Sequence, residues 1–240
     1  MFSLVLPAHN EAPRLENSVK KIIAALKEVD YEIIIAEDGS TDGTYDIAKR
    51  LEKANKRIRV IHAEEKLGRG KALKRAFSIS KGDSVGYIDV DLATDLKYLP
   101  QLIEYSKKYD MVTGSRYTPG AKTERPLLRK FFSTCYNIII RIFLGCKIYD
   151  SQCGFKAFSR RFVEKEIANI KENTWAWDTV VLVEGIKKGY SFKEFPVEWT
   201  EMKEKAHSAS FKRIYSDVKK HGLVLLKLFA KWRLGMKVEV

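Results

Sequence analysis

The chain has 240 residues, a hydrophobic content of 45% and a formal net charge of +13. This length and composition fit one sizeable globular α/β domain and exclude a chain that is disordered throughout. Residues 205–240 contain nine Lys or Arg residues against Asp217 and Glu239, so this segment supplies over half of the net charge. A basic tail indicates an anionic partner, which can be nucleic acid, a phospholipid surface or a phosphorylated substrate.

The cysteines and the hydropathy pattern indicate the compartment. Cys135, Cys146 and Cys153 are an odd number without metal-site spacing, so we expect reduced thiols and a cytosolic protein. No signal peptide precedes the first predicted strand, and no apolar run approaches the roughly 18–20 residues that span a bilayer. The sequence therefore predicts a protein that is soluble or peripheral to a membrane.

Apolar strands alternate with amphipathic helices in the first half of the chain. We predict strands at 2–6, 31–36, 58–62 and 84–88, and helices at 13–28, 45–54 and from the turn at 68–71 to about 80. This alternation predicts an α/β fold with a mostly parallel sheet and helices on both faces. In such sheets, ligands bind beyond the carboxyl ends of the strands.

Two carboxylates follow the strand predicted at 84–88. Asp89 and Asp91 flank Val90, and side chains at i and i+2 of an extended segment point to the same side. Two convergent carboxylates suit a hard divalent cation that keeps positions open for phosphate oxygens. The alternative is a solvated turn that caps the next helix, and a bare Asp-x-Asp favours it, so the interpretation depends on the surroundings.

Polar groups also follow the first two strands. Asn10 and Glu11 come after the first strand, and Glu37 and Asp38 come after the second. Acidic and amide groups suit the hydroxyl and N–H donors of a ribose and a base edge. Gly39 allows close backbone approach, although Asp-Gly-Ser alone is more typical of an ordinary turn.

The turn Gly68-Arg69-Gly70-Lys71 opens a predicted helix. Its backbone N–H groups and the Lys71 ammonium could therefore meet a phosphate. The turn matches neither a P-loop nor a dinucleotide-binding fingerprint, and by itself it is a weak signal.

Taken together, these motifs resemble those of family 2 glycosyltransferases with the GT-A fold. The motifs that carry the resemblance are Val5-Leu6-Pro7-Ala8-His9-Asn10-Glu11, Glu37-Asp38-Gly39-Ser40-Thr41-Asp42-Gly43-Thr44, Gly68-Arg69-Gly70-Lys71-Ala72 and Asp89-Val90-Asp91. Two further motifs resemble the branch that glycosylates a polyprenyl phosphate, which includes dolichyl-phosphate glucose and mannose synthases: Gly114-Ser115-Arg116-Tyr117 and Asp150-Ser151-Gln152-Cys153-Gly154-Phe155-Lys156. The resemblance covers roughly residues 2–200.

The resemblance implies a site for a nucleoside diphosphate sugar, with Asp89 and Asp91 holding Mg²⁺ or Mn²⁺ against its pyrophosphate. The residues that it implies for this site are Pro7, Ala8, Asn10, Glu11, Glu37, Asp38, Gly39, Gly70, Lys71, Asp89, Val90 and Asp91. Position 37 is Glu where the family usually has Asp, and Ala93 stands where mannose synthases often carry a polar residue. Ala93 lowers the weight of a mannose donor, and the likeness to glucose synthases around residues 150–156 implies a UDP-sugar, with GDP-mannose next.

The branch likeness also implies a site for the acceptor's phosphate. We expect Arg116, Arg129 and Ser133 to hold it, because guanidinium binds phosphate oxygens bidentately. Arg116 follows the strand predicted at 111–113 and should face the same cleft as the aspartates. We interpret Arg125 as solvated charge.

Two helices carry exposed-looking apolar residues beside basic ones. The helix predicted at 131–144 either packs on the core or lies in a lipid headgroup layer. Residues 210–237 predict one or two basic amphipathic helices, which suit an anionic membrane surface. We expect no nucleic acid partner, because no nucleic-acid-binding motif appears.

Three positions near the end of the domain have competing interpretations. Asp178 suits the N-cap of a helix predicted at 179–188, and the alternative is an active-site carboxylate near the sugar. For Trp175 and Trp177 we favour core packing over stacking on a sugar. His207 is expected to be a solvent residue in a polar loop.

The sequence thus predicts a glycosyltransferase domain at 1–205, with a nucleotide-sugar half (1–95) and an acceptor half (96–205), followed by a basic helical segment at 206–240. The expected reaction is metal-dependent inverting transfer of a hexose to dolichyl or polyprenyl phosphate on the cytoplasmic face of a membrane, with Asp89, Asp91 and Arg116 as catalytic residues. We assign no general base, because a phosphate monoester with a second pKa of about 6 is already mostly anionic at neutral pH. The alternatives are a soluble-sugar or lipid-linked saccharide acceptor, and a non-catalytic basic module that binds membrane or nucleic acid.

Overall fold

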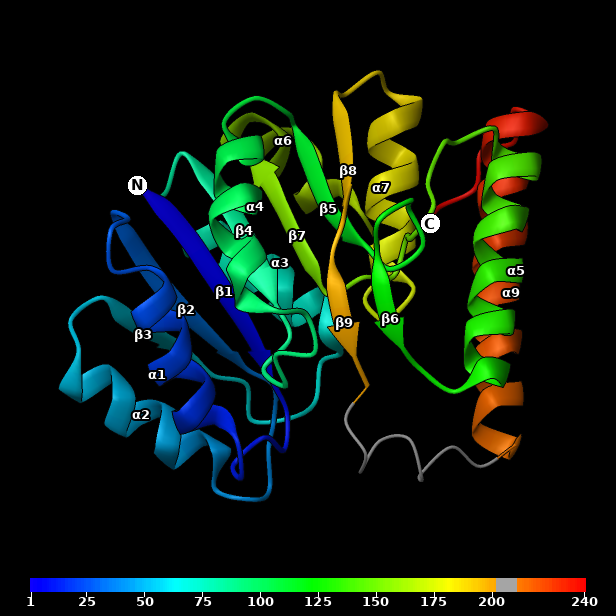
Figure 1. Ribbon diagram of the computed structural model, residues 1–240. Coiled ribbons are helices and arrows are strands. Elements are labelled where there is room, and N and C mark those ends of the chain that lie inside the picture. Colours follow the sequence, from blue (N-terminus) through cyan, green and yellow to red (C-terminus); the bar gives the residue numbers. More distant parts are fainter. Residues whose placement is uncertain (202–210) are drawn as a thin grey trace.

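The computed structural model describes residues 1–201 and 211–240, with residues 211–220 described only as part of a helix. Its centre is a seven-stranded sheet in the order β3-β2-β1-β4-β7-β5-β8 (Figure 1). The strands of this sheet are β1 (Phe2–Ala8), β2 (Tyr31–Glu37), β3 (Ile58–Ile61), β4 (Ser84–Ile88), β5 (Met111–Ser115), β7 (Phe155–Ser159) and β8 (Phe192–Pro196). The α-helices are α1 (Leu15–Ala25), α2 (Thr44–Ala54), α3 (Arg69–Ile79), α4 (Leu99–Ser106), α5 (Leu127–Leu144), α6 (Arg160–Lys165), α7 (Trp177–Lys187) and α9 (Phe211–Arg233).

The first half of the chain folds as its periodicity predicts. Strands β1 to β4 are mutually parallel and alternate with α1, α2 and α3. Strand β7 is antiparallel to both of its neighbours, β4 and β5, so the sheet is mixed but mostly parallel. The predicted α/β class is therefore confirmed.

The register of β7 brings two distant segments together. Phe155, at the start of β7, pairs with Ile88, at the end of β4. One residue beyond, the N–H of Asp89 donates to the carbonyl of Gly154 at 3.1 Å. The antiparallel strand thus begins where β4 ends, and it delivers the 150–156 segment to the ligand-binding edge of the sheet.

Side chains from the two faces of the sheet form two hydrophobic cores. One face packs on α1, α2 and α4, through residues such as Leu15, Ala48 and Leu102. The other packs on α3, α6 and α7, and an aromatic cluster of four rings fills it, with centroids 5.9–6.4 Å apart in all six pairs. This aromatic cluster consists of Phe77, Tyr87, Phe158 and Trp177.

A second, two-stranded sheet lies beside the main one. It pairs β6 (Lys122–Glu124) in parallel with β9 (Glu198–Thr200). The chain leaves the main sheet after Pro196 and begins β9 at Glu198. Sequence periodicity did not predict β6, because this strand is short and polar. The second sheet places Trp199 opposite Thr94.

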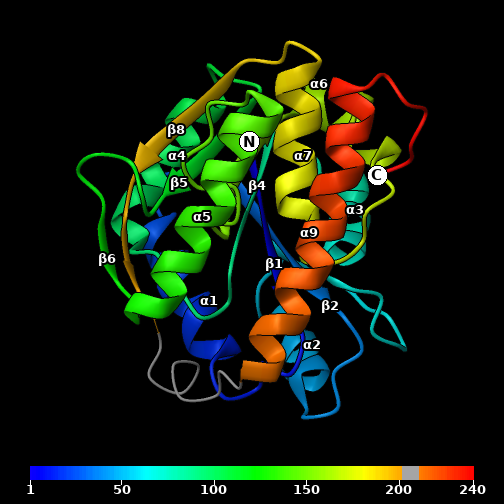
Figure 2. The same cartoon turned by 90° about the vertical axis from the view of Figure 1, so that its right-hand side faces the viewer.

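Helices α5 and α9 lie side by side at one end of the sheet (Figures 1 and 2). Val224, Leu225 and Leu228 of α9 join the core, and Lys231 and Trp232 both donate to Oε1 of Glu184 on α7, at 2.8 and 3.0 Å. The helix predicted from 210 is therefore present from Phe211 to Arg233, and His207 lies outside the described residues.

Two further expectations concern thiols and membrane spans. The three cysteines are free thiols, as expected. Across residues 1–201 and 211–240, none of the helices has both the length and the hydropathy that crossing a bilayer demands.

Phe158 tests the aromatic cluster. We expect Phe158→Ala to lower the free energy of unfolding by about 3–5 kcal/mol, because the fully buried ring leaves a cavity that the sheet cannot close. Urea denaturation measures this change. The control is Phe131→Ala on α5, where the ring is 62% exposed and the change should stay within about 0.5 kcal/mol. Equal losses in the two variants would contradict this assignment of the core.

Candidate active site at the carboxyl ends of the strands

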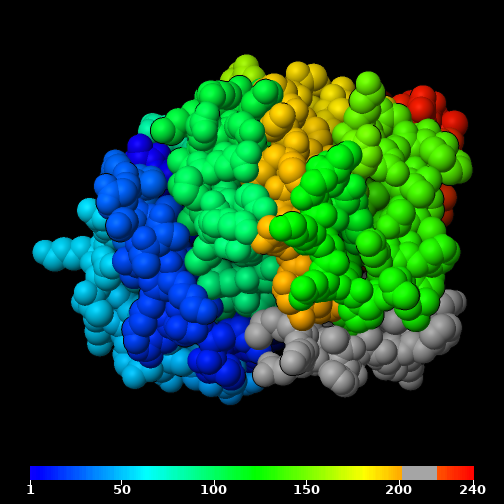
Figure 3. Space-filling model, viewed as in Figure 1, coloured from blue at the N-terminus to red at the C-terminus, as the bar shows by residue number. Residues whose placement is uncertain are grey.

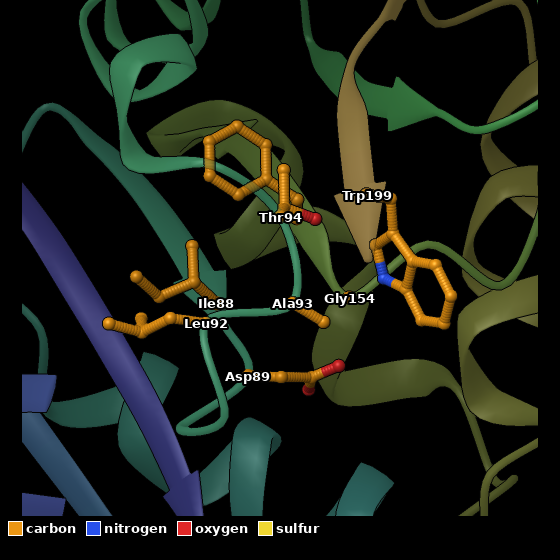
Figure 4. Close-up of a pocket in the computed structure, with 8 residues that line it drawn as sticks. Ile88, Asp89, Leu92, Ala93, Thr94, Gly154 and Trp199 are labelled. Atoms are coloured by element: carbon orange, nitrogen blue, oxygen red, sulfur yellow. The ribbon is translucent and has the colours of Figure 1, made fainter. Parts of the chain in front are cut away.

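Asp89 lines a small cavity beyond the end of β4. The cavity is lined by Ile88, Asp89, Leu92, Ala93, Thr94, Gly154, Phe155 and Trp199 (Figure 4). The Asp89 side chain is 33% exposed. Asp91 lies in the turn that follows, where its Oδ1 accepts the N–H of Ala93 at 3.2 Å and Leu92 adopts a φ of +50°. Both carboxylates of the motif are therefore partly open to ligands.

Arg69 lies against Asp89 and is almost completely buried. Its Nη2 is 2.7 Å from Oδ1 of Asp89, and its Nε donates to Oδ2 of Asp178 at 3.3 Å. The guanidinium also lies over the rings of Tyr87 and Trp175, at 5.2 and 4.7 Å from their centroids. The Arg69 guanidinium thus fixes the position of Asp89, and Asp178 and the two aromatic rings hold the guanidinium in place.

The predicted role of Asp178 as an N-cap is wrong. Helix α7 begins at Trp177, its N-cap is Ala176, and no side chain caps it. Asp178 instead accepts hydrogen bonds from the Tyr87 hydroxyl, from Lys156 at 3.4 Å and from Arg69. Burial pushes its pKa up, but the two cations more than offset this and hold the pKa below its ordinary value. A buried, ionised and fully engaged carboxylate is unsuited to removing a proton from an acceptor.

The two tryptophans before α7 have different environments. Trp177 is fully buried, as expected for core packing. Trp175 is 62% exposed and stacks on Arg69, so the core interpretation is wrong for this residue.

The residues at Asp89 fit a divalent cation. Burial raises the pKa of Asp89 above its ordinary value, and the negative charges of Asp91 and Asp178 add to this, although Arg69 opposes it. A bound cation would offset the repulsion between these carboxylates. Among the described residues, no group of three or more His, Cys, Asp or Glu side chains is arranged to bind a metal. A pair of carboxylates suits Mg²⁺ or Mn²⁺ when phosphate oxygens and water complete the shell.

The loops expected to hold the nucleotide are tied to one another. The Asn10 amide oxygen accepts the N–H of Thr41 at 2.9 Å, and the Asn10 N–H donates to the Ser40 hydroxyl at 2.9 Å. Glu11 pairs with Arg14 at 2.8 Å. Pro7 and Ala8 end β1, and the carbonyl of buried Val90 accepts from the Ser18 hydroxyl at 2.6 Å. These contacts fix the rim of the site, and direct contacts with a nucleotide stay predictions.

Glu37 and Asp38 are buried and serve the loops. Glu37 accepts the N–H of Ser40 at 2.7 Å and also contacts His62. Asp38 accepts the N–H groups of Leu67 and Gly68 at 2.8 and 3.1 Å, which ties the end of β2 to the turn before α3. Both carboxylates therefore order the loops around the site in this structure.

The N-terminus of α3 is tied to the segment before α7. The N–H groups of Gly70 and Lys71 both point at the carbonyl of Asn173, at 2.9 and 3.4 Å, and a contact between these groups and a phosphate stays a prediction. Gly70 is also needed for packing, because a Cβ would approach the Trp177 side chain to 2.7 Å. Gly39 has a φ of +64° and lies against the backbone of Glu65 and Lys66. The exposed Lys71 ammonium remains a predicted phosphate ligand.

Arg116 is buried against Asp150. Its Nε and Nη2 donate to the two carboxylate oxygens at 2.6 and 2.8 Å, and its backbone N–H donates at 3.0 Å. Arg116 is 8% exposed and Asp150 is fully buried. The bidentate fork that we expected to bind phosphate is thus engaged inside the protein. A contact between Arg116 and the acceptor stays a prediction, and it would use only the guanidinium N–H groups that Asp150 does not engage.

The interpretation of Arg125 as solvated charge is wrong. Its side chain is 16% exposed, and Nη1 donates to the Ser133 hydroxyl at 2.9 Å and to the Tyr117 hydroxyl at 3.2 Å. Its Nε has no hydrogen-bond partner among the described residues, and burial lowers its pKa. Arg129 pairs with Glu201. The structure thus brings Ser133 to Arg125 rather than to Arg116.

Trp199 connects the two parts of the site. The guanidinium groups of Arg116 and Arg125 lie 5.2 and 5.5 Å from its ring centroid, and the same side chain lines the Asp89 cavity (Figure 4). We call Arg116, Arg125, Arg129, Ser133 and Trp199 the basic cluster. Sequence reasoning missed Trp199, Arg69 and Asp150, since their roles depend on partners far away in the sequence.

Asp150 tests the buried ion pair. We expect Asp150→Asn to lower the free energy of unfolding by about 3–5 kcal/mol at pH 7, because Arg116 keeps a buried charge without a counterion. Burial alone would raise the pKa of Asp150, but Arg116 holds it below its ordinary value. The wild-type advantage should therefore be complete above pH ~4 and disappear as the pH falls through the lower native pKa.

Urea denaturation between pH 2.5 and pH 7 measures this dependence. The control is Glu104→Gln, which removes an exposed ion pair to Lys108 at 2.6 Å and should change stability by less than about 0.5 kcal/mol. A difference between wild type and Asp150→Asn that stays constant over this range would contradict the assignment.

Comparison with known proteins identifies the family. The family model described as glycosyl transferase family 2 matches residues 3–166. Glycosyltransferase AglD of Haloferax volcanii is 44% identical over 203 residues, which cover 82% of this chain and 32% of the relative. The dolichyl-phosphate beta-glucosyltransferase ALG5C of Trichomonas vaginalis is 31% identical over 83% of this chain and 64% of the relative. The chain thus spans about a third and about two thirds of the length of these relatives.

Solved structures confirm the fold. Glucosyl-3-phosphoglycerate synthase of Mycobacterium tuberculosis in complex with UDP superposes with a TM-score of 0.72 at 20% identity, over 96% of this chain and 80% of that one. Its complex with Mn²⁺, UDP and phosphoglyceric acid gives a TM-score of 0.71 at 21% identity, over 95% and 78%. The predicted GT-A fold is therefore confirmed, and the chain belongs to glycosyltransferase family 2.

Proposed function

We propose that this chain carries a metal-dependent, inverting hexosyltransferase activity from a nucleoside diphosphate sugar to a polyprenyl (dolichyl-type) phosphate. The observation that carries the proposal is the shared position of Trp199, which lines the Asp89 cavity and lies beneath the guanidinium groups of Arg116 and Arg125. A cation-binding carboxylate pair thus lies next to a basic cluster, as joining a diphosphate donor to a phosphate acceptor requires. Residues 1–95 form the donor half in this proposal and 96–205 the acceptor half, and the C-terminal segment binds a membrane.

The similar proteins support the choice of donor. Relatives named dolichyl-phosphate beta-glucosyltransferase act on a dolichyl phosphate and a glucosyl donor by their names. A solved neighbour was crystallised with Mn²⁺, UDP-glucose and phosphoglyceric acid, whose phosphate group resembles the acceptor's in chemistry. Together with Ala93, these names favour UDP-glucose over GDP-mannose.

The residues of the chain divide the reaction between them. Asp89 and Asp91 would hold a divalent cation, which when bound would neutralise the charge that builds on the leaving diphosphate. The basic cluster holds the acceptor's phosphate in line with the anomeric carbon, which supplies the entropic part of the rate. A phosphate oxygen then forms the new bond to that carbon while the bond to the leaving diphosphate breaks, and the configuration inverts.

Proton transfer needs no residue in this mechanism. A phosphate monoester with a second pKa of about 6 is already mostly a dianion at neutral pH. Asp178 is a buried carboxylate that shares Arg69 with Asp89, and its oxygens accept hydrogen bonds from Tyr87, Lys156 and Arg69. A sugar hydroxyl acceptor would need a base, so the engagement of Asp178 favours the phosphate acceptor.

Donor binding tests the carboxylate pair. We expect UDP-glucose with Mn²⁺ to raise the melting temperature of the wild-type chain, because a ligand that binds only the native state stabilises it. Asp89→Ala should abolish this rise, and Glu104→Ala, which removes an exposed carboxylate on α4, should keep it. Differential scanning fluorimetry with UDP- and GDP-sugars, with and without Mn²⁺, measures the effect. A full response in Asp89→Ala would contradict the proposal.

An acceptor screen separates the alternatives. Transfer of radiolabelled hexose to a polyprenyl phosphate supports the proposal, and transfer to free sugar or a lipid-linked saccharide alone rejects it. If isothermal titration shows no binding of any sugar nucleotide with Mn²⁺, the chain is instead a non-catalytic basic module.

The exposed apolar face of α5 supports the membrane part of the proposal. Figure 3 shows this helix at the surface beside β6, on the right-hand side of the view. Its exposed apolar residues are 38–83% accessible, and two apolar residues of α9 next to it are also exposed. Patches of this kind mark interaction sites, and nearby Lys and Arg residues favour anionic headgroups. The exposed apolar residues of this face are Leu127, Leu128, Phe131, Phe132, Ile138, Ile139, Ile142 and Phe143 of α5, with Leu223 and Leu226 of α9.

Vesicle binding tests this face. We expect Ile142→Asp, at a position 66% exposed, to weaken binding to anionic phospholipid vesicles by about tenfold or more, because a charged group replaces an apolar one at the lipid boundary. Co-sedimentation measures the bound fraction. Ala24→Asp, which makes the same charge change on exposed α1, should leave binding unaltered. Equal loss in both variants would show that net charge, and not this face, carries the binding.

A further inference from the structure

Gly154 is the residue directly before β7, and it lies against the carboxylate of Asp89. A Cβ placed on Gly154 would overlap Oδ2 and the carboxyl carbon of Asp89 and would lie only 2.8 Å from Oδ1. These are the three atoms nearest to that Cβ, and all belong to one side chain. Figure 4 shows both residues at the same cavity, with the Asp89 carboxylate directed towards the 154 segment.

Backbone conformation gives no reason for a glycine at this position. Gly39, Gly43 and Gly68 have φ values of +64°, +85° and +96°, which L side chains rarely adopt, but Gly154 is not among the positive-φ glycines. Gly154 also precedes a strand that is paired on both sides, by β4 and by β5. The space taken by the Asp89 carboxylate is therefore the physical reason for the missing side chain.

Three contacts together fix the orientation of Asp89. Its N–H donates to the Gly154 carbonyl at 3.1 Å, which sets the backbone. Its Oδ1 lies 2.7 Å from Nη2 of Arg69. Its Oδ2 lies over the bare Cα of Gly154. Because Arg69 holds Oδ1, the position of Oδ2 depends on whether position 154 carries a side chain.

We propose that Gly154 is a positioning residue for the candidate donor site: its missing side chain lets the Asp89 carboxylate lie across the backbone at 154, with Oδ1 on Arg69 and its remaining lone pairs open to a cation. This inference rests on the proposed function for its cation, whereas its steric part stands on the structure alone. Any side chain at 154 displaces the carboxylate, because that group rotates more easily than the paired strand moves. Cation and diphosphate binding are then weakened while the fold is kept.

A double-mutant cycle in thermal stability tests the steric part without any ligand. In wild type, Gly154→Ala should lower the melting temperature by about 2–8 °C, since the displaced carboxylate loses its place on Arg69. In the Asp89→Ala background, where the carboxylate is gone, Gly154→Ala should change the melting temperature by less than about 1 °C. A drop of equal size in both backgrounds overturns the proposal, because the glycine would then be needed for another reason.

Binding of Mn²⁺ in the presence of UDP tests the positioning part. The expected result for Gly154→Ala is affinity about 10- to 100-fold weaker than wild type, measured from the electron paramagnetic resonance signal of free Mn²⁺, with an unchanged far-ultraviolet circular dichroism spectrum. Gly222→Ala is the matched control, since a Cβ there meets no atom within 4 Å, and it should bind Mn²⁺ as wild type does.

The outcomes separate this inference from the proposed function. If wild type binds Mn²⁺ with UDP and Gly154→Ala binds it equally well, the positioning role is overturned and the proposed function stands. If wild type binds no Mn²⁺ with UDP or UDP-glucose, the proposed donor site and the positioning role fail together, and the melting cycle still decides whether Gly154 makes room for Asp89.

Discussion

The candidate site depends on one buried guanidinium. Arg69 joins Asp89 to Asp178, and Lys156 adds a second cation to Asp178. Burying such charges is costly unless they are paired, and each of these groups has at least one partner of opposite sign. Loss of any member would leave its partners charged in a dry environment. The network therefore keeps Asp89 in place in the wall of the cavity before any ligand arrives.

The antiparallel strand β7 makes this network possible. It enters the sheet between β4 and β5, so that its first residues lie beside the end of β4. The segment before and within it supplies Asp150 to Arg116, Gly154 to Asp89 and Lys156 to Asp178. One short stretch of chain thus supports both the Asp89 cavity and the basic cluster. A purely parallel sheet would bring a helix connection to this edge instead.

Local patterns in the sequence predicted most of the fold and part of the site. Apolar periodicity gave β1 to β4 and the helices between them, because these elements depend on nearby residues. The placement of β7, the burial of Arg125 and the role of Asp178 did not follow from it, since each depends on contacts between residues far apart. Asp178 meets Tyr87 across 91 positions, and Arg116 meets Asp150 across 34. A capping rule cannot detect such a partner, and a charge count cannot distinguish a buried arginine from a solvated one.

The burial of acidic groups determines the electrostatics that a ligand meets. Glu37, Asp38, Asp150 and Asp178 all sit in or beside the motifs, yet each is at most 4% exposed and is bound to backbone N–H groups or cations. The Asp89 side chain, by contrast, remains a third exposed. The acidic residues of the motifs therefore mainly hold the loops and cations around the site in place. A phosphate that approaches the basic cluster meets less negative charge than the number of acidic residues in the motifs suggests. In the proposed function, this internal use of carboxylates lets an anionic donor and an anionic acceptor share one site.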